Sequence, residues 1–112
     1  MRLTSVMWLG VFMRQESARG AYVTVVKTGA QQAGAMFVLH NRLKGAYDLY
    51  GPAPQSIFED KNSDRKFELL LQDIDLAVAE NYLDKQKNFD PDLWVIETES
   101  GIGEISLEIM RA

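Results

Sequence analysis

Short blocks of apolar and β-branched residues alternate with polar connections through the first half of the chain. The blocks are Tyr22–Lys27, Ala35–Asn41 and Ala46–Tyr50, and glycines stand between them. Blocks of this length and composition predict β-strands. The connections are short, which favours antiparallel neighbours, so we expect these three strands to form a meander.

A second kind of spacing follows from Asp75 to about Asn88, where apolar residues recur at helical intervals. We expect Asp73 or Asp75 to cap this helix, and Pro91 requires it to end before residue 91. The apolar side comprises Ile74, Leu76, Val78, Ala79, Tyr82 and Leu83. This side should lie on the sheet, with Val78 and Leu83 buried.

The apolar stretch Val6–Met13 has two interpretations. As a helix it begins after the capping residues Thr4 and Ser5 and ends near Arg19, because Gly20 is a typical residue after a helix. As a strand it would be apolar on both faces, which suits a central position. The stop at Gly20 favours the helix, whose apolar face would hold Met7, Trp8, Val11, Phe12 and Ala18.

The remaining segments complete an α+β pattern. Lys66–Leu71, Leu93–Thr98 and Glu104–Ile109 are expected strands, the last with Ile105, Leu107 and Ile109 inward after a hairpin-like turn at 100–103. Gly51–Ser56 predicts a constrained loop, and Glu59–Arg65 an exposed polar one. We therefore predict a single domain over 1–112. It should have an antiparallel sheet of about five or six strands, with one or two helices packed on one face.

The corner Asn88–Ile96 joins the clearest helix to an apolar strand. Pro91 lacks an N–H group, and Asp90 and Asp92 beside it can accept hydrogen bonds from nearby backbone N–H groups. We expect Phe89 to turn inward and Trp94 to enter the sheet. The aspartates could also serve acid–base chemistry or bind a hard metal ion, but acids beside a proline are more often turn residues.

Composition narrows the class of protein. The 112 residues are 46% hydrophobic and include no cysteine, which excludes disulfides and thiolate chemistry. Net charge is −4: residues 1–56 hold six Lys+Arg and two acids (+4), and residues 57–112 hold six and fourteen (−8). No apolar run is long enough for a membrane span. The lack of cysteine is compatible with a reducing compartment, and we expect no cofactor and no membrane partner.

Other candidate chemistry is weak. His40 is the only histidine, and its place at a strand end predicts a rim position. The glycines at 29, 34, 101 and 103 match no phosphate-binding loop. A basic patch for nucleic acid would comprise Arg14, Arg19, Lys27, Arg42 and Lys44, with Tyr22, Tyr47 or Tyr50 for stacking.

Three stretches together resemble a small bacterial family known as a domain of unknown function, DUF1491. They are Thr28-Gly29 through Ala33-Gly34-Ala35, Leu49-Tyr50-Gly51-Pro52-Ala53-Pro54, and Phe89-Asp90-Pro91-Asp92-Leu93-Trp94-Val95. The sequence departs from the family pattern at Gln15, where a basic residue is usual, and at Ala30, where an acid is expected. The resemblance spans nearly the whole chain and implies a compact cytoplasmic bacterial domain, without an activity.

The sequence thus favours a non-enzymatic binding or protein-interaction module that self-associates. The candidate binding surface comprises Arg14, Arg42, Tyr50, Pro52, Pro54, Asp90, Asp92 and Trp94. The alternatives are a nucleic-acid-binding module that uses the basic N-terminal half, and a small acid–base or metal-dependent enzyme that uses Asp90 and Asp92. We predict no catalytic, cofactor or metal residue, and a homo-oligomer or another protein as the partner.

Overall fold

The computed structural model describes residues 3–54, 65–101 and 104–110. The elements follow one another as α1 (Ser5–Ala18), β1 (Tyr22–Lys27), β2 (Met36–Asn41), β3 (Tyr47–Pro52), β4 (Lys66–Ile74), α2 (Leu76–Phe89), β5 (Trp94–Glu99) and β6 (Glu108–Ile109). The strands form a single sheet in the order β1-β5-β2-β3-β4-β6. Both expected loops reach into 55–64, which lies outside the described residues; Gly51 and Pro52, expected in the first of them, end β3 instead.

The sheet is mixed, so the expected purely antiparallel sheet and the meander of the first three strands are wrong. β2 and β3 pair antiparallel as expected, but β5 lies between β1 and β2, antiparallel to β1 and parallel to β2. The physical reason is burial. Trp94, Val95 and Ile96 are buried on both faces of the sheet, which requires a central strand.

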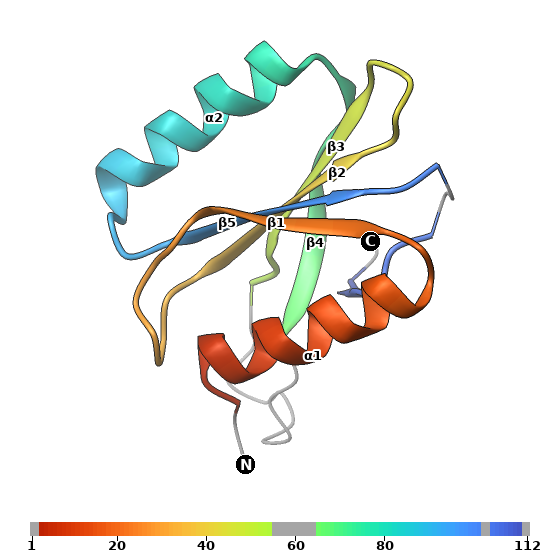
Figure 1. Ribbon diagram of the computed structural model, residues 1–112. Coiled ribbons are helices and arrows are strands. Elements are labelled where there is room, and N and C mark those ends of the chain that lie inside the picture. Colours follow the sequence, from red (N-terminus) through yellow and green to blue (C-terminus); the bar gives the residue numbers. More distant parts are fainter. Residues whose placement is uncertain (1–2, 55–64, 102–103, 111–112) are drawn as a thin grey trace.

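The helices lie on opposite faces of the sheet, which corrects the prediction that they share one face (Figure 1). We call these the α1 face and the α2 face. β2 is buried at every position from Met36 to His40, so both of its sides need cover. One helix on each face provides that cover.

The helical interpretation of the N-terminal segment is confirmed. The Thr4 hydroxyl oxygen accepts a hydrogen bond from the Met7 N–H group at 3.2 Å, and Gly20 follows the helix with φ +88°. The buried side differs from the expected one. Leu9, Phe12 and Glu16 face the sheet, and Met7 is 52% exposed.

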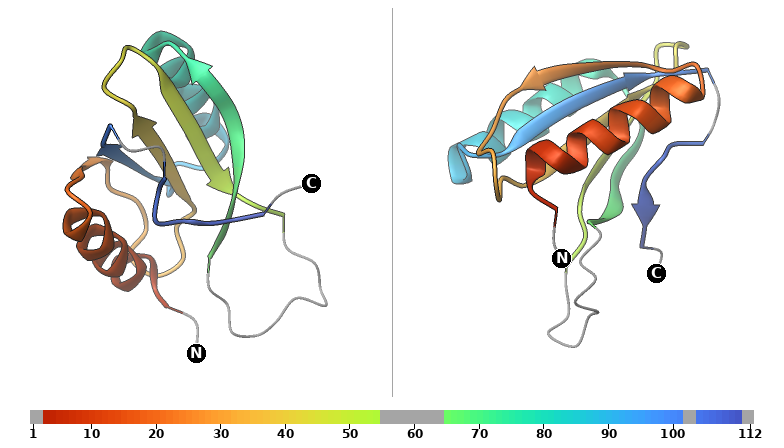
Figure 2. Two further views of the ribbon diagram at one scale, coloured as in Figure 1. Left: turned by 90° about the vertical axis from the view of Figure 1, so that its right-hand side faces the viewer. Right: turned by 60° about the horizontal axis from the view of Figure 1, so that its bottom comes forward.

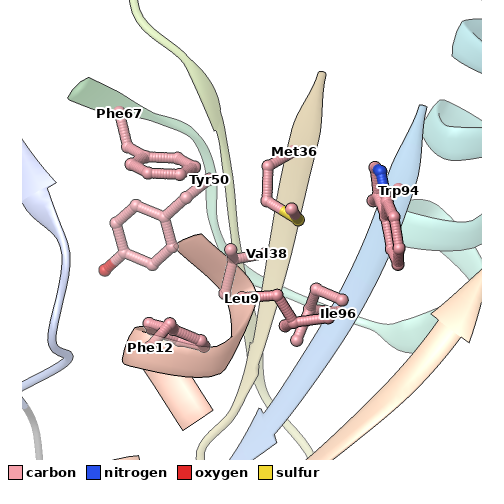
Figure 3. Close-up of a cluster of buried hydrophobic side chains, with 8 residues drawn as sticks. All are labelled: Leu9, Phe12, Met36, Val38, Tyr50, Phe67, Trp94 and Ile96. Carbon is pink, nitrogen blue, oxygen red and sulfur yellow. The ribbon is translucent and has the colours of Figure 1, made fainter. Parts of the chain in front are cut away.

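The core on the α1 face joins α1 to five residues of the central strands and one of β4 (Figure 3). Its members are Leu9, Phe12, Met36, Val38, Tyr50, Phe67, Trp94 and Ile96. The rings of Trp8 and Phe12 stack with centroids 5.0 Å apart, and Trp8 also contacts Phe67. The first face is therefore rich in aromatic packing.

The core on the α2 face is aliphatic apart from Phe37. Ala79 and Leu83 of α2 are buried against a cluster that comprises Phe37, Leu39, Leu49, Leu93 and Val95. The expected burial of Leu83 is thus confirmed, but Val78 is 47% exposed. The helix is rotated so that Ala79, one residue further on, makes the close approach to the sheet.

The C-terminal segment crosses the α1 face to the opposite edge of the sheet (Figure 2). Ile105, Leu107 and Ile109 pack partly buried against the core of that face, as expected. The regular strand is only β6, which pairs parallel with β4, so the expected hairpin with β5 is wrong. Residues 102 and 103 of that turn lie outside the described residues.

Candidate functional site

The corner after α2 is closed by one carboxylate. Asp90 Oδ1 accepts a hydrogen bond from the Asp92 N–H group at 3.1 Å, and the Asp90 carbonyl oxygen accepts one from Leu93. This is the turn that an aspartate before proline favours. Phe89, expected inward, is 85% exposed at the end of α2. Ala79 and Leu83 hold α2 on the sheet, and at helical spacing Phe89 does not share their side of the helix.

The loop between β1 and β2 packs directly on this corner. The Ala30 N–H group donates to the Asp92 carbonyl oxygen at 2.9 Å, and the Trp94 indole N–H donates to the Ala30 carbonyl oxygen at 2.8 Å. A Cβ atom at Gly29 or Gly34 would overlap the Asp92 carbonyl oxygen. Two of the stretches that carried the family resemblance therefore form one structural unit.

Lys27 joins the same unit from the end of β1. Its ammonium group donates to the carbonyl oxygens of Pro91 at 2.7 Å and Leu93 at 2.8 Å. These two carbonyls lie where the chain leaves the corner and are satisfied by this cation. Lys27 thus has an internal role, although the sequence placed it in a possible basic patch.

The third stretch of the family resemblance also has a packing role. Tyr50 is buried in the core, and a Cβ atom at Gly51 would overlap Leu70 and Phe37. Pro52 is exposed and Ala53 buried, and both line a cavity of about 290 Å³ with Arg65 and Lys66. The Arg65 guanidinium donates to the Gly34 carbonyl and the Ser5 hydroxyl, which fixes the start of α1.

A buried polar cluster occupies the opposite end of the α1 face. The Glu16 carboxylate accepts hydrogen bonds from the Thr98 hydroxyl at 2.6 Å and the Ser106 N–H group at 2.9 Å. Glu16 is 2% exposed, so an unpaired carboxylate there would be costly. These two hydrogen bonds compensate for the burial of the carboxylate, and the bond from Ser106 also connects the C-terminal segment to α1.

His40 belongs to this cluster and is fully buried, which corrects the expected rim position. Its Nε2 atom and the Ser100 hydroxyl are 3.0 Å apart and share a hydrogen bond. Burial lowers the pKa of His40 below its ordinary value, against the opposing effects of the Ser100 contact and of Asp48 and Glu16. The imidazole is therefore neutral at pH 7.

His40, Ser100 and Asp48 have the residue types of a hydrolytic triad, but their burial gives them another role. They are 0%, 5% and 7% exposed, so a substrate cannot reach the Ser100 hydroxyl. Asp48 accepts a hydrogen bond from the Asp73 N–H group and pairs with Arg42, rather than orienting the imidazole. The geometry favours a packed polar layer between strands.

The predicted binding-surface residues do not come together. Tyr50 and Trp94 are core residues, Arg14 is exposed on α1, and Arg42 pairs with Asp48 and Asp73 beyond the end of β2. Of the remaining four, Pro52 is the last residue of β3 and Pro54 follows it, and Asp90 and Asp92 follow the end of α2. Among the described residues, no group of three or more side chains is arranged to hold a metal ion.

The α2 face carries a partly apolar surface feature that the sequence did not indicate. A groove of about 360 Å³ runs between α2 and the strands β1, β2 and β5. Its lining comprises Val26, Leu39, Leu76, Glu80, Leu83, Asp84, Lys87, Val95 and Glu97. Burial raises the pKa of Tyr47, and the nearby carboxylates of Glu97, Glu99 and Glu80 raise it further. Acidic side chains therefore continue along the α2 face beyond the groove.

The edge strand β1 borders the groove. Val23 packs on the α1 face, so Tyr22 and Thr24 point to the α2 face, where Tyr22 is 68% exposed. Val26 is 54% exposed and lines the groove. Among the described residues no strand pairs with the outer edge of β1, so an open strand edge and the groove lie side by side. The apolar periodicity of α2 alone could not reveal the groove, because the groove arises from where α2 sits on the sheet.

Comparison with known proteins gives one family. The model of the family described as "Protein of unknown function (DUF1491)" matches residues 3–108. The chain is similar to protein Atu0922 from A. tumefaciens, known from its solution structure, with 37% identity, 99% and 98% of the two chains covered and a TM-score of 0.84.

Two structures of a DUF1491 family protein from Caulobacter crescentus share the fold at 24% identity. The crystal structure gives a TM-score of 0.78 with 99% and 100% of the chains covered, and the NMR structure 0.77 with 99% of each. No protein with a curated description matches the chain. Among the described residues, none of the helices is both long and apolar enough to cross a membrane.

Proposed function

The chain belongs to the DUF1491 family of unknown function, and we propose that it is a non-enzymatic, cytoplasmic protein-interaction domain that self-associates through β1. The observation that carries this proposal is the free edge of β1. Tyr22–Val26 contain neither proline nor a charged residue, and the strand is largely exposed. Proteins usually protect such edges with charges, prolines or very short strands.

The other edge of the sheet is protected in that way. β6 has two residues, so it offers little backbone for pairing. In β1 a register shift between Val25 and Lys27 leaves Tyr22–Val25 as the regular part. Two copies of this segment can pair antiparallel about a two-fold axis, because such an interface uses the same patch on both copies. The sheets of both copies would then be continuous.

The placement of the cations does not favour the nucleic-acid alternative. Lys27 binds backbone carbonyls, Arg42 pairs with two aspartates, and Arg19 donates to Ser106 and Glu104. The groove beside β1 has three acids and one lysine in its lining. A phosphate backbone would be repelled there. The enzyme alternative has no support from Asp90, whose carboxylate closes its own turn.

Static light scattering across a wide protein concentration range tests the proposal. The mass should rise toward that of a dimer in the wild type and remain monomeric in Thr24→Lys, because an edge lysine opposes strand pairing. Thr24→Val is the matched control and should associate like the wild type. Equal masses for all three proteins, or a monomer throughout in the wild type, would overturn the proposal.

Amide hydrogen exchange provides a second readout. In the monomer, the N–H groups of β1 that point away from β5 should exchange fast, and alternate ones slowly. Self-association through β1 should slow the fast set selectively. Association that leaves this alternation unchanged would place the interface elsewhere.

A further inference from the structure

One helix cannot cover the α2 face of this sheet. Strands lie about 4.8 Å apart and a packed helix occupies about 10 Å, so each helix covers roughly two strands. The α2 core reaches β2, β3 and β4, and of β5 it buries Val95. The strip over β5 and β1 has no helix above it, and the groove lies in this strip.

The residues that line the groove indicate which side chains a helix lying there must carry. Val26 and Leu76 supply the exposed apolar surface of the groove, and the core residues Leu39, Leu83 and Val95 lie beneath it. Glu80, Asp84 and Glu97 add three negative charges, and the single cation Lys87 pairs with Asp84 at 3.5 Å, so the lining has a net charge of −2. An occupant needs an apolar stripe for the exposed apolar surface and cations beside that stripe for the acids.

The α2 helix of a second copy does not meet this description. Its outward side is mostly polar and comprises Ala77, Asn81, Asp84, Lys85 and Asn88, with the exposed Val78 and Phe89 at its flank. Asp84 of that helix would also approach the acids of the groove. Placing such a side in the groove would bury polar groups without partners. The occupant is therefore a helix of different composition.

We propose that the groove formed by α2, β5 and β1 binds a basic amphipathic helix of a partner protein, by the helix-in-groove mode. This inference goes beyond self-association, because pairing at β1 uses the backbone edge and the groove uses side chains on the α2 face. Dimer formation through β1 would leave the two grooves open on the same side of the continuous sheet.

A synthetic peptide titrated into ¹⁵N-labelled protein tests the inference. The probe is a helical peptide of about 15 residues, matching the length of α2, with leucines on one side and lysines elsewhere. Amide shift changes should concentrate at Val26, Val95, Glu97 and the groove side of α2. A twin peptide with glutamate in place of lysine should bind at least about 10-fold more weakly.

Charge reversal in the protein is the matched test. Glu80→Lys combined with Asp84→Lys should weaken binding of the lysine peptide at least about 10-fold, because both carboxylates are exposed in the groove. Glu104→Lys, together with Glu108→Lys, changes the net charge equally at exposed positions away from the groove, and should leave affinity unchanged. Raised salt should weaken the wild-type complex.

Three results would overturn the inference. They are shift changes centred on the α1 face, equal binding of both peptides, or absence of binding. Amide shift changes at the groove that depend on protein concentration, and not on added peptide, would also overturn the inference, because the occupant would then be a second copy. Repeating the titration with Val25→Lys separates the two proposals, because Val25 lies on the α1 face, opposite Ile96, and a lysine there opposes edge pairing without entering the groove. Peptide binding by this monomer supports the groove even if self-association through β1 fails.

Discussion

The backbone of Gly29 lies against the carbonyl group of Asp92, and a Cβ atom at position 29 would overlap that carbonyl oxygen and the Leu93 backbone. The obstacle is backbone, which cannot move aside as a flexible side chain can. Close approach of two chain segments, rather than an unusual φ angle, therefore explains this glycine. It also explains how residues more than sixty positions apart form one corner.

Gly29→Ala should lower the free energy of unfolding by about 1–3 kcal/mol, the usual cost of overpacking a well-packed site. Gly10→Ala is the control, because nothing lies within 4 Å of a Cβ atom there and the residue is inside α1. It should raise stability by up to about 1 kcal/mol through helix propensity. Urea denaturation of both variants measures the contrast, and equal effects would refute the close approach.

Leu83→Ala should cost about 2–5 kcal/mol, because the side chain is 4% exposed and its removal leaves a cavity on the α2 face. Val78→Ala, on the same helix but 47% exposed, should change stability by less than about 0.5 kcal/mol. Thermal or urea denaturation distinguishes them. A Leu83→Ala protein as stable as the wild type would show that α2 is not docked through this residue.

Asp90→Ala should lower stability by about 0.5–1.5 kcal/mol through loss of the bond from the Asp92 N–H group. Asp90→Asn should retain most of that stability, because its amide oxygen can still accept the bond. Asp92→Ala should have a small effect, since its side chain is exposed. Added Mg²⁺ or Ca²⁺ should leave the melting temperature unmoved. A wild-type melt that rises with these ions, but an Asp90→Ala melt that does not, would make the corner a metal site.

The stability of the fold should decrease as pH falls below about 6.5, the ordinary pKa of histidine. The pKa of His40 is lowered in the folded protein, so in this range the unfolded chain binds more protons than the folded one. Stability therefore rises with pH through this window and is fully present above it. His40→Gln should lack this dependence between about pH 5 and 7, where most carboxylates stay ionised. Melting curves at several pH values measure the difference, and a flat wild-type profile would contradict it.

Local signals in the sequence were sufficient for most elements. Thr4 and Gly20 marked the ends of α1, and the helical spacing before Pro91 marked α2. The strands followed from their β-branched and aromatic composition. Asp90 was recognised as a turn residue because its acceptor role depends only on neighbours two residues away.

Relations between distant segments were not accessible in the same way. The sequence places β1 next to β2, but the burial of both faces of β5 places that strand between them. The predicted rim position of His40 was wrong for the same reason. The end of a strand is exposed only if nothing packs over it, and here Glu16, Thr98 and Ser100 from other parts of the chain pack around His40. The binding-surface residues predicted from the sequence included Tyr50 and Trp94, which are buried in the core.

The sequence alone therefore determined most of the residues that form helices and strands, since periodicity, capping and turn chemistry act over a few residues. Only the tertiary structure decided the strand order, the placement of the helices on opposite faces, and the groove at Val26, Leu76 and Val95. These depend on how far each helix covers the sheet. Coverage is a property of packed surfaces, and no single segment encodes it.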